Sequence, residues 1–141
     1  MSLRRAVELN FKERLQRAFE GTRYTVVEGV SNKERPNPCV VVLAGEATAA
    51  FPNLSDSLGN YNCDVSIIIL SSLDVDGVDQ HNDAANIVSS TLSGRDIRKV
   101  SLVENLYLYD FVRLSVAESN EPEGRKIGTV FNYRATINYN P

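Results

Sequence analysis

A long alternation of apolar and polar side chains near the C-terminus constrains the fold more than any other feature of the chain. The members on one side of it are Ile127, Phe131, Tyr133, Ala135, Ile137 and Tyr139. This period of two predicts a strand over residues 125–139, and residues 107–118 before it predict the first arm of a hairpin. A strand of that length spans on the order of 40 Å at about 3.3 Å per residue. We therefore expect the hairpin to reach beyond its own core, onto another subunit.

The N-terminal segment predicts a helix over residues 3–20. Its apolar residues recur every fourth position and form one stripe: Leu3, Val7, Phe11, Leu15 and Phe19. Gly21 follows as a natural C-terminal stop. On the same segment Glu8 precedes Lys12 by four positions, the spacing of a helical ion pair.

The middle of the chain predicts three further strands and a second helix. The strands cover residues 24–28, 39–43 and 59–71, and a polar loop is expected over 44–58. The continuous apolar run at 39–43 indicates a strand covered on both faces. A helix is expected over 79–92 with Asp79 as its N-cap, followed by a short helix or irregular segment over 97–102.

These elements fit one domain covering residues 1–141. The chain of 141 residues is long enough for one hydrophobic core and too short for two. The predicted order gives an α+β fold, with a mostly antiparallel (mixed) sheet, helices on one face and a long C-terminal β-hairpin.

Charge is unevenly distributed along the sequence. Residues 1–35 carry eight basic and five acidic side chains, residues 36–94 carry seven acidic and no basic ones, and residues 95–141 are near balance. An acid-only middle is unlike a nucleic-acid grip, which needs clustered cations. The segregation suits head-to-tail contact between copies, although a solvated surface explains it equally well.

No segment of the sequence predicts catalytic chemistry. Cys39 and Cys63 lie in apolar, strand-like stretches and are expected to be buried. His81 has no partner at an interpretable spacing, so an exposed or half-buried helix position is expected. The acidic run at 74–79 lacks the spacing of a calcium loop. We therefore expect no catalytic residue, no cofactor and no metal site.

The candidate functional residues are instead charged or polar groups suited to contacts between subunits. The candidates for a subunit or partner interface are Arg4, Arg5, Arg14, Arg17, Glu121, Glu123, Arg125, Lys126, Asn132 and Arg134. The candidates for an acidic face or lumen are Asp74, Asp76, Asp79 and Asp83. No apolar run is long enough to cross a membrane and no signal segment is evident, so the protein is expected to fold in a cytoplasm.

In order and size these elements resemble the tail terminator (tail completion) proteins of tailed bacteriophages. The matching features are the amphipathic first helix, the strand at 24–27, the proline-entered strand at 36–42, the alternating strand at 61–70, the helix at 79–92 and the closing hairpin. The long loop at 44–58 departs from the pattern.

The resemblance implies a role in a virion tail or neck, assembled in the cytoplasm of a bacterial host. It implies a homo-oligomeric ring, commonly a hexamer, that caps the tail tube, ends its polymerisation and binds the head connector. DNA would pass through the lumen without specific binding, which carboxylates lining a pore would favour. The resemblance implies no catalytic residue.

Two other functions remain open on the sequence alone. A head–tail connector or neck ring protein of the same virion would share ring assembly. A small ligand-binding α+β domain, from a different class, would need a concave site with convergent polar groups. The oligomeric state separates this third function from the first two.

Overall fold

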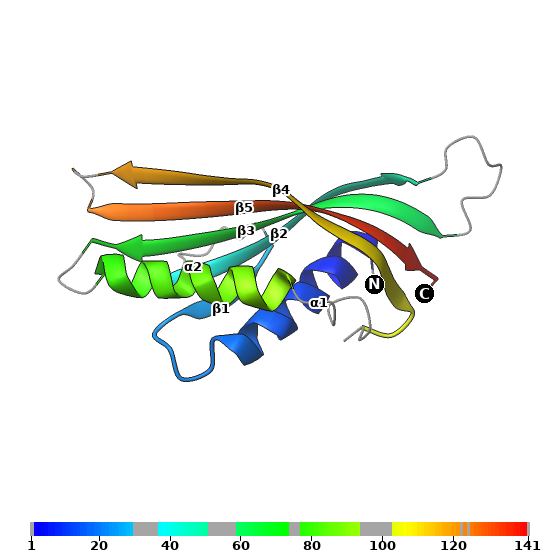
Figure 1. The fold of residues 1–141 in the computed structure, drawn as a ribbon. Coiled ribbons are helices and arrows are strands. Elements are labelled where there is room, and N and C mark those ends of the chain that lie inside the picture. The colour runs from blue at the N-terminus through cyan, green and yellow to red at the C-terminus, as the bar shows by residue number, and fades with distance from the viewer. Residues whose placement is uncertain are drawn as a thin grey trace.

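The computed structural model contains two helices and five strands, in the order α1, β1, β2, β3, α2, β4, β5 (Figure 1). It describes residues 2–29, 37–50, 59–73, 77–93, 103–121, 123 and 125–140. The helices are α1 (Leu3–Ala18) and α2 (Gly77–Ser93), and the strands are β1 (Thr25–Glu28), β2 (Cys39–Ala49), β3 (Asn60–Ser72), β4 (Leu106–Glu121) and β5 (Lys126–Tyr139).

The strands form one mixed sheet in the order β1-β2-β3-β5-β4. β1 pairs with β2 in parallel, and every other neighbouring pair is antiparallel. The hairpins β2–β3 and β4–β5 extend toward opposite ends of the sheet (Figure 1). The predicted α+β class with a mixed, mostly antiparallel sheet and a long C-terminal hairpin is confirmed.

Both helices lie on one face of this sheet (Figure 1). Helix α1 begins after Ser2, whose hydroxyl accepts a hydrogen bond from the Arg5 N–H at 3.2 Å. This N-cap satisfies one of the helix's otherwise unpaired backbone donors. Gly21, at a φ of 81°, turns the chain after the helix toward β1. α1 packs on β1 and β2, whereas α2 packs on β3. The half of β4 next to the β4–β5 turn therefore has no helix packed above it.

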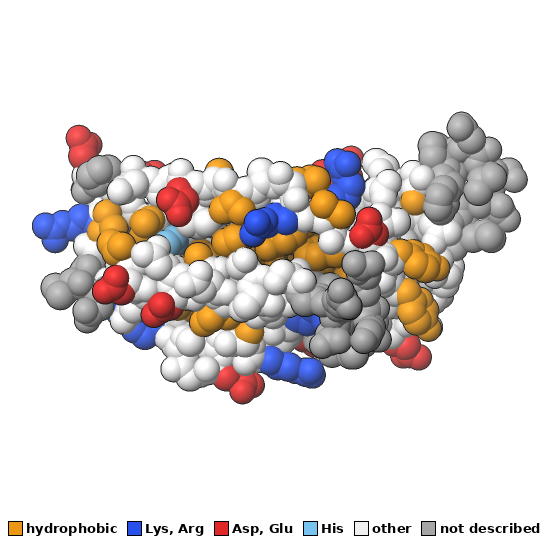
Figure 2. All heavy atoms as spheres, in the orientation of Figure 1, with side chains coloured by type: hydrophobic (Ala, Val, Ile, Leu, Met, Phe, Trp, Pro, Cys, Tyr) orange, Lys and Arg blue, Asp and Glu red, His pale blue; other side chains and the backbone are white. Residues whose placement is uncertain are grey.

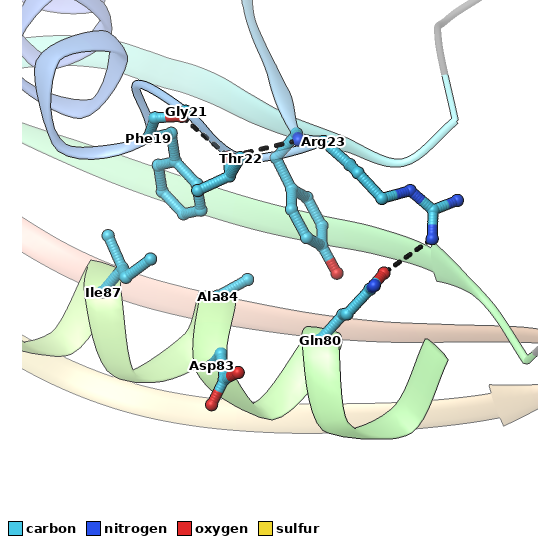
Figure 3. Close-up of a pocket in the computed structure, with 9 residues that line it drawn as sticks. Phe19, Gly21, Thr22, Arg23, Gln80, Asp83, Ala84 and Ile87 are labelled. Atoms are coloured by element: carbon cyan, nitrogen blue, oxygen red, sulfur yellow. Dashed lines mark hydrogen bonds between the residues drawn. The ribbon is translucent and has the colours of Figure 1, made fainter. Parts of the chain in front are cut away.

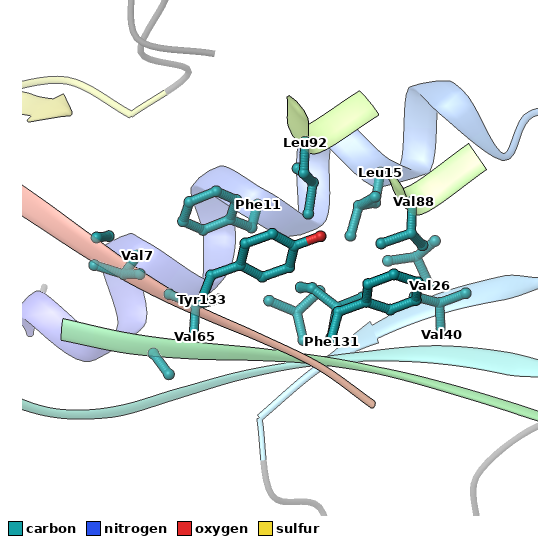
Figure 4. Packing of buried hydrophobic residues seen from close by; sticks show 14 of the residues in the cluster. Val7, Phe11, Leu15, Val26, Val40, Val65, Val88, Leu92, Phe131 and Tyr133 are labelled. Atoms are coloured by element: carbon teal, nitrogen blue, oxygen red, sulfur yellow. The ribbon is translucent and has the colours of Figure 1, made fainter. Parts of the chain in front are cut away.

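The core lies between the helices and the sheet (Figure 4). Phe11 and Leu15 of α1 and Val88 of α2 are fully buried against the β-branched residues of β2 and β3. Three aromatic rings link α1 to the hairpin. Phe11 stacks on Phe111 with centroids 5.1 Å apart, and Phe111 stacks on Tyr133 at 4.6 Å. These contacts fix the first half of β4 to the core.

The structure corrects the expected loop at 44–58. β2 continues to Ala49 across a bulge between Ala44 and Ala47, and residues 51–58 lie outside the described part. At the bulge the Ala44 N–H donates to Glu8 Oε2 at 3.1 Å. A side chain from α1 thus takes the place of a neighbouring strand at the Ala44 N–H. No local pattern in residues 44–49 predicts this contact.

Two smaller expectations also differ from the structure, and a third is not tested by it. Glu8 is buried against β2, so Lys12 pairs with Glu28 at 3.3 Å instead of with Glu8. Helix α2 begins at Gly77, which places Asp79 in its first turn and not at the N-cap. The segment expected over 97–102 lies outside the described residues.

Candidate interaction surface

A chain of buried hydrogen bonds connects α2 to the sheet, and it contains the single histidine. His81 Nδ1 lies 2.7 Å from Ser71 Oγ, and its Nε2 lies 2.7 Å from Thr129 Oγ1. The Tyr24 hydroxyl extends the chain, at 2.6 Å from Ser71 Oγ. The expectation of an exposed or half-buried His81 is wrong, because the side chain is only 1% exposed. It falls on the inner stripe of α2, in line with Ala84, Val88 and Leu92.

This hydroxyl–imidazole pair is not built as a nucleophile and base. A catalytic serine must reach a substrate, whereas Ser71 is buried and its hydroxyl already contacts Tyr24. Within the described residues no carboxylate is hydrogen-bonded to the imidazole to orient it. This row of buried hydrogen bonds therefore serves to fix α2 on β3 and β5.

The buried histidine predicts a loss of stability in mild acid. Burial lowers the pKa of His81 below its usual 6.5, against a smaller opposing effect of Glu118. The unfolded chain then binds a proton more readily than the folded one. Stability is full above about pH 6.5 and falls as the pH drops through the folded-state pKa. Thermal unfolding between about pH 7.5 and 5 should show this fall, and His81→Gln should flatten it. An unchanged slope in His81→Gln would contradict the assignment.

A cavity of about 250 Å³ opens between the end of α1 and the first half of α2. Figure 3 shows the Phe19 ring pointing toward Ala84 and Ile87, which together form an apolar floor. At the rim, Arg23 Nη1 donates to Gln80 Oε1 at 2.7 Å, and the Asp83 carboxylate lies nearby. The floor has the size and character to accept one or two apolar side chains, and the rim offers both signs of charge.

The basic candidates on α1 do not converge on one site. Arg5 is paired with Glu28 at 2.9 Å, and Arg4 and Arg17 are exposed. Arg14 is half-buried, and its Nε and Nη2 have no hydrogen-bond partner among the described residues. Burial and the neighbouring Arg17 lower the pKa of Arg14 from its usual range.

The acidic candidates and the hairpin tip lie elsewhere. Asp79 and Asp83 are exposed on α2, whereas Asp74 and Asp76 lie outside the described residues. At the hairpin tip, Glu121 and Lys126 are register partners, and Glu123 and Arg125 are exposed. The Leu73 N–H donates to the Arg125 carbonyl at 2.7 Å, so the hairpin tip lies at the same end of the molecule as the start of α2, which carries Asp79 (Figure 1). The predicted interface residues are spread over α1, the hairpin tip and β5, and they do not form one patch.

The last two candidates belong to the face of the sheet opposite the helices. Asn132 accepts from Ser66 at 2.8 Å and donates to Ser115 at 3.0 Å, and Arg134 Nε lies 3.2 Å from Asp64 Oδ1. Asn62 accepts from Thr136 at 2.9 Å in the next row. These polar side chains satisfy one another across the strands, which gives a hydrophilic surface with paired charges.

Sequence reasoning missed the exposed apolar side chains of β4. Among the described residues, the large apolar side chains that are exposed are Tyr107, Tyr109, Val112, Leu114 and Val116 on β4, and Val78 on α2. Figure 2 shows a band of hydrophobic side chains between the β4–β5 hairpin and α2. The available signal for this exposure was that apolar residues occupy both faces of the predicted strand. Bulges near residues 109 and 114 break the alternation that would have shown which face each side chain takes.

The described residues contain no group of three or more His, Cys, Asp or Glu side chains placed to hold a metal ion. No described helix is long and apolar enough to cross a membrane. Both cysteines are buried, and burial raises the pKa of Cys63 to about 11, which opposes thiolate chemistry. The described geometry therefore offers surfaces for contact with other molecules.

Comparison with solved structures shows a shared fold over nearly the whole chain. The chain is similar to a chain in the structure "Virion of native gene transfer agent (GTA) particle", with a TM-score of 0.64 and 20% sequence identity. The match covers 94% of this chain and 94% of the other. No protein-family model matches the sequence, and no curated protein matches it. At this identity the likeness shows the fold alone.

Proposed function

We propose that this protein is a structural subunit of a phage-like virion, and that it forms the ring that ends a tail tube. The observation that carries the proposal is the fold shared end to end with a chain of a gene transfer agent virion. The order of the elements supports it, since it follows the tail terminator pattern from the first helix to the closing hairpin.

The described surfaces suit such a role. A subunit of a closed ring needs two different contact surfaces, one on each side. The chain offers the exposed apolar β4 at one edge of the sheet. It offers α1, with Arg4 and Arg17 exposed, over β1 and β2 toward the other edge. In this proposal the ring binds the tube protein below and the head connector above, and DNA passes through its lumen without specific contacts.

Capping of tail tubes tests this function. Purified protein is added to growing tubes of the virion's own tube protein, and tube lengths and ends are imaged by negative stain. We expect shorter tubes with a ring at one end, and a ring of about six copies in the concentrated protein. Matched tubes without the protein are the control. Rings that ignore tube ends but bind the head portal would favour a connector. A monomer at every concentration that neither binds nor shortens tubes would contradict both.

A further inference from the structure

The face of the sheet opposite the helices carries rows of polar side chains. Phe131, Tyr133 and Ala135 of β5 belong to the core, so the residues between them point to the other face, away from both helices (Figure 1). We call the polar part of this other face the polar strand face. Its members come from β3, β4 and β5 and are Asn60, Asn62, Asp64, Ser66, Ser115, Asn132, Arg134, Thr136 and Asn138. It is bordered by Ile68 and Val130 toward the hairpin tip, and at the β4 edge by Tyr107, Asp110 and Val112.

Side chains of the polar strand face use their hydrogen-bond donors on one another. Asn138 Nδ2 donates to Asn60 Oδ1 at 3.0 Å, and Thr136 Oγ1 donates to Asn62 Oδ1 at 2.9 Å. Asn132 Nδ2 donates in the same way to the next strand. Asparagine, serine and threonine donors are among the groups that bind DNA phosphates in complexes. A donor that is already bonded across the strands gains little by exchanging its partner for a phosphate.

The two sides of the molecule also differ in their exposed cations. Arg134 is the one cation of the polar strand face, and its Nε lies 3.2 Å from Asp64 Oδ1. The helix side exposes Arg4 and Arg17 on α1, and Arg113, whose register partner is the core residue Tyr133. Clustered cations are what holds double-stranded DNA. The helix side is therefore the one suited to retain DNA, whereas DNA can move past the polar strand face.

We propose that the polar strand face lines the lumen of the ring and is the surface past which DNA moves. The inference rests on the proposed function, because only a ring around the DNA path has a lumen. With this face inward, α1 and α2 lie on the outer side, and Asp79 and Asp83 of α2 do not face the DNA. Such a lumen passes DNA because its polar groups are already paired, and it does not depend on repulsion by a ring of carboxylates.

Lysine placed on the polar strand face tests the assignment. Ser115→Lys adds an exposed cation to this face in every subunit, and Ser90→Lys, at an exposed serine of α2, is the matched control. Rings, free or on tube ends, are mixed with one plasmid in its linear or its closed circular form, and bound DNA is measured by filter retention. An end of linear DNA can thread a closed ring, whereas circular DNA cannot. We expect Ser115→Lys rings to bind the linear form at least about tenfold more tightly than the circular form, because several added lysines then contact phosphates at once. Wild-type and Ser90→Lys rings should not distinguish the two forms.

The outcomes separate this assignment from the proposed function. Ser115→Lys rings that cap tubes but show no preference for linear DNA would overturn the lumen assignment and leave the function standing. A preference for linear DNA in Ser90→Lys rings would place α2 at the lumen and also overturn it. If Ser115→Lys does not assemble, Thr136→Lys on β5 takes its place. Failure of both beside an assembling Ser90→Lys would make this face a subunit contact and overturn its place in the lumen. A wild type that neither forms rings nor caps tubes would contradict the proposed function itself.

Discussion

Replacing Phe11 by alanine is expected to lower the free energy of unfolding by about 3–5 kcal/mol, the usual cost of removing a buried aromatic ring. Phe11 is 1% exposed, and its ring stacks on Phe111, which in turn stacks on Tyr133. Phe11→Ala removes the first ring of this stack and leaves a cavity between α1 and the hairpin. Urea unfolding followed by circular dichroism measures the difference.

The control for this substitution is Phe11→Leu, which keeps most of the apolar volume and should cost clearly less than Phe11→Ala. The difference in unfolding free energy between the two variants gives the contribution of the aromatic ring of Phe11. A loss below about 1 kcal/mol in Phe11→Ala would contradict the packing described here, because it would mean that α1 is not fixed to β4 through this side chain.

The helices and the C-terminal hairpin could be predicted because their signals are local. Phe11 and Leu15 repeat with the period of a helix, and Tyr133 and Ile137 repeat with the period of a strand, whatever lies across from them. The alternation in β5 also predicted which of its side chains are buried. Phe131, Tyr133, Ala135 and Ile137 all belong to the core.

The extension of β2 could not be predicted, because its cause is not local. Residues 44–49 are small or polar and show no apolar alternation, yet they pair with β3 beyond a bulge. Beyond the end of β1, the Ala44 N–H is satisfied by Glu8, which lies 36 positions away in sequence and reaches it from α1. A glutamate on a predicted helix is assigned to the solvent or to a neighbouring lysine by any local rule.

The candidate site was the least predictable part for the same reason. Charge pointed to Arg14, Asp83 and the hairpin tip, but charged side chains are mostly solvated and say little about contact. The apolar exposure of β4 depends on α2 lying over β3 and leaving β4 uncovered, which is a fact of tertiary packing. His81 was likewise misplaced because its two hydroxyl partners come from β3 and β5.

Placing a carboxylate among the exposed apolar side chains of β4 is expected to weaken assembly at least about tenfold while leaving the fold intact. Val116→Glu puts a charge where a ring contact through β4 would exclude water, and such a buried, unpaired charge typically costs enough to weaken association by at least about tenfold. Val116 is 46% exposed in the single chain, so the unfolding free energy should change by about 1 kcal/mol or less. Sedimentation velocity across concentrations and the tube-capping assay measure the loss.

Val78→Glu is the matched control, since Val78 is the same residue type with the same 46% exposure but lies on α2 and outside the cavity lining. It should assemble and cap tubes as the wild type does, because a new glutamate in the first turn of a helix is tolerated or favourable. If both variants lose assembly equally, general surface charge and not the β4 edge governs association. If Val116→Glu assembles normally, the exposed apolar part of β4 is not a contact surface, and the search for the ring interface moves to α1 and to Arg14, whose Nε and Nη2 have no hydrogen-bond partner among the described residues.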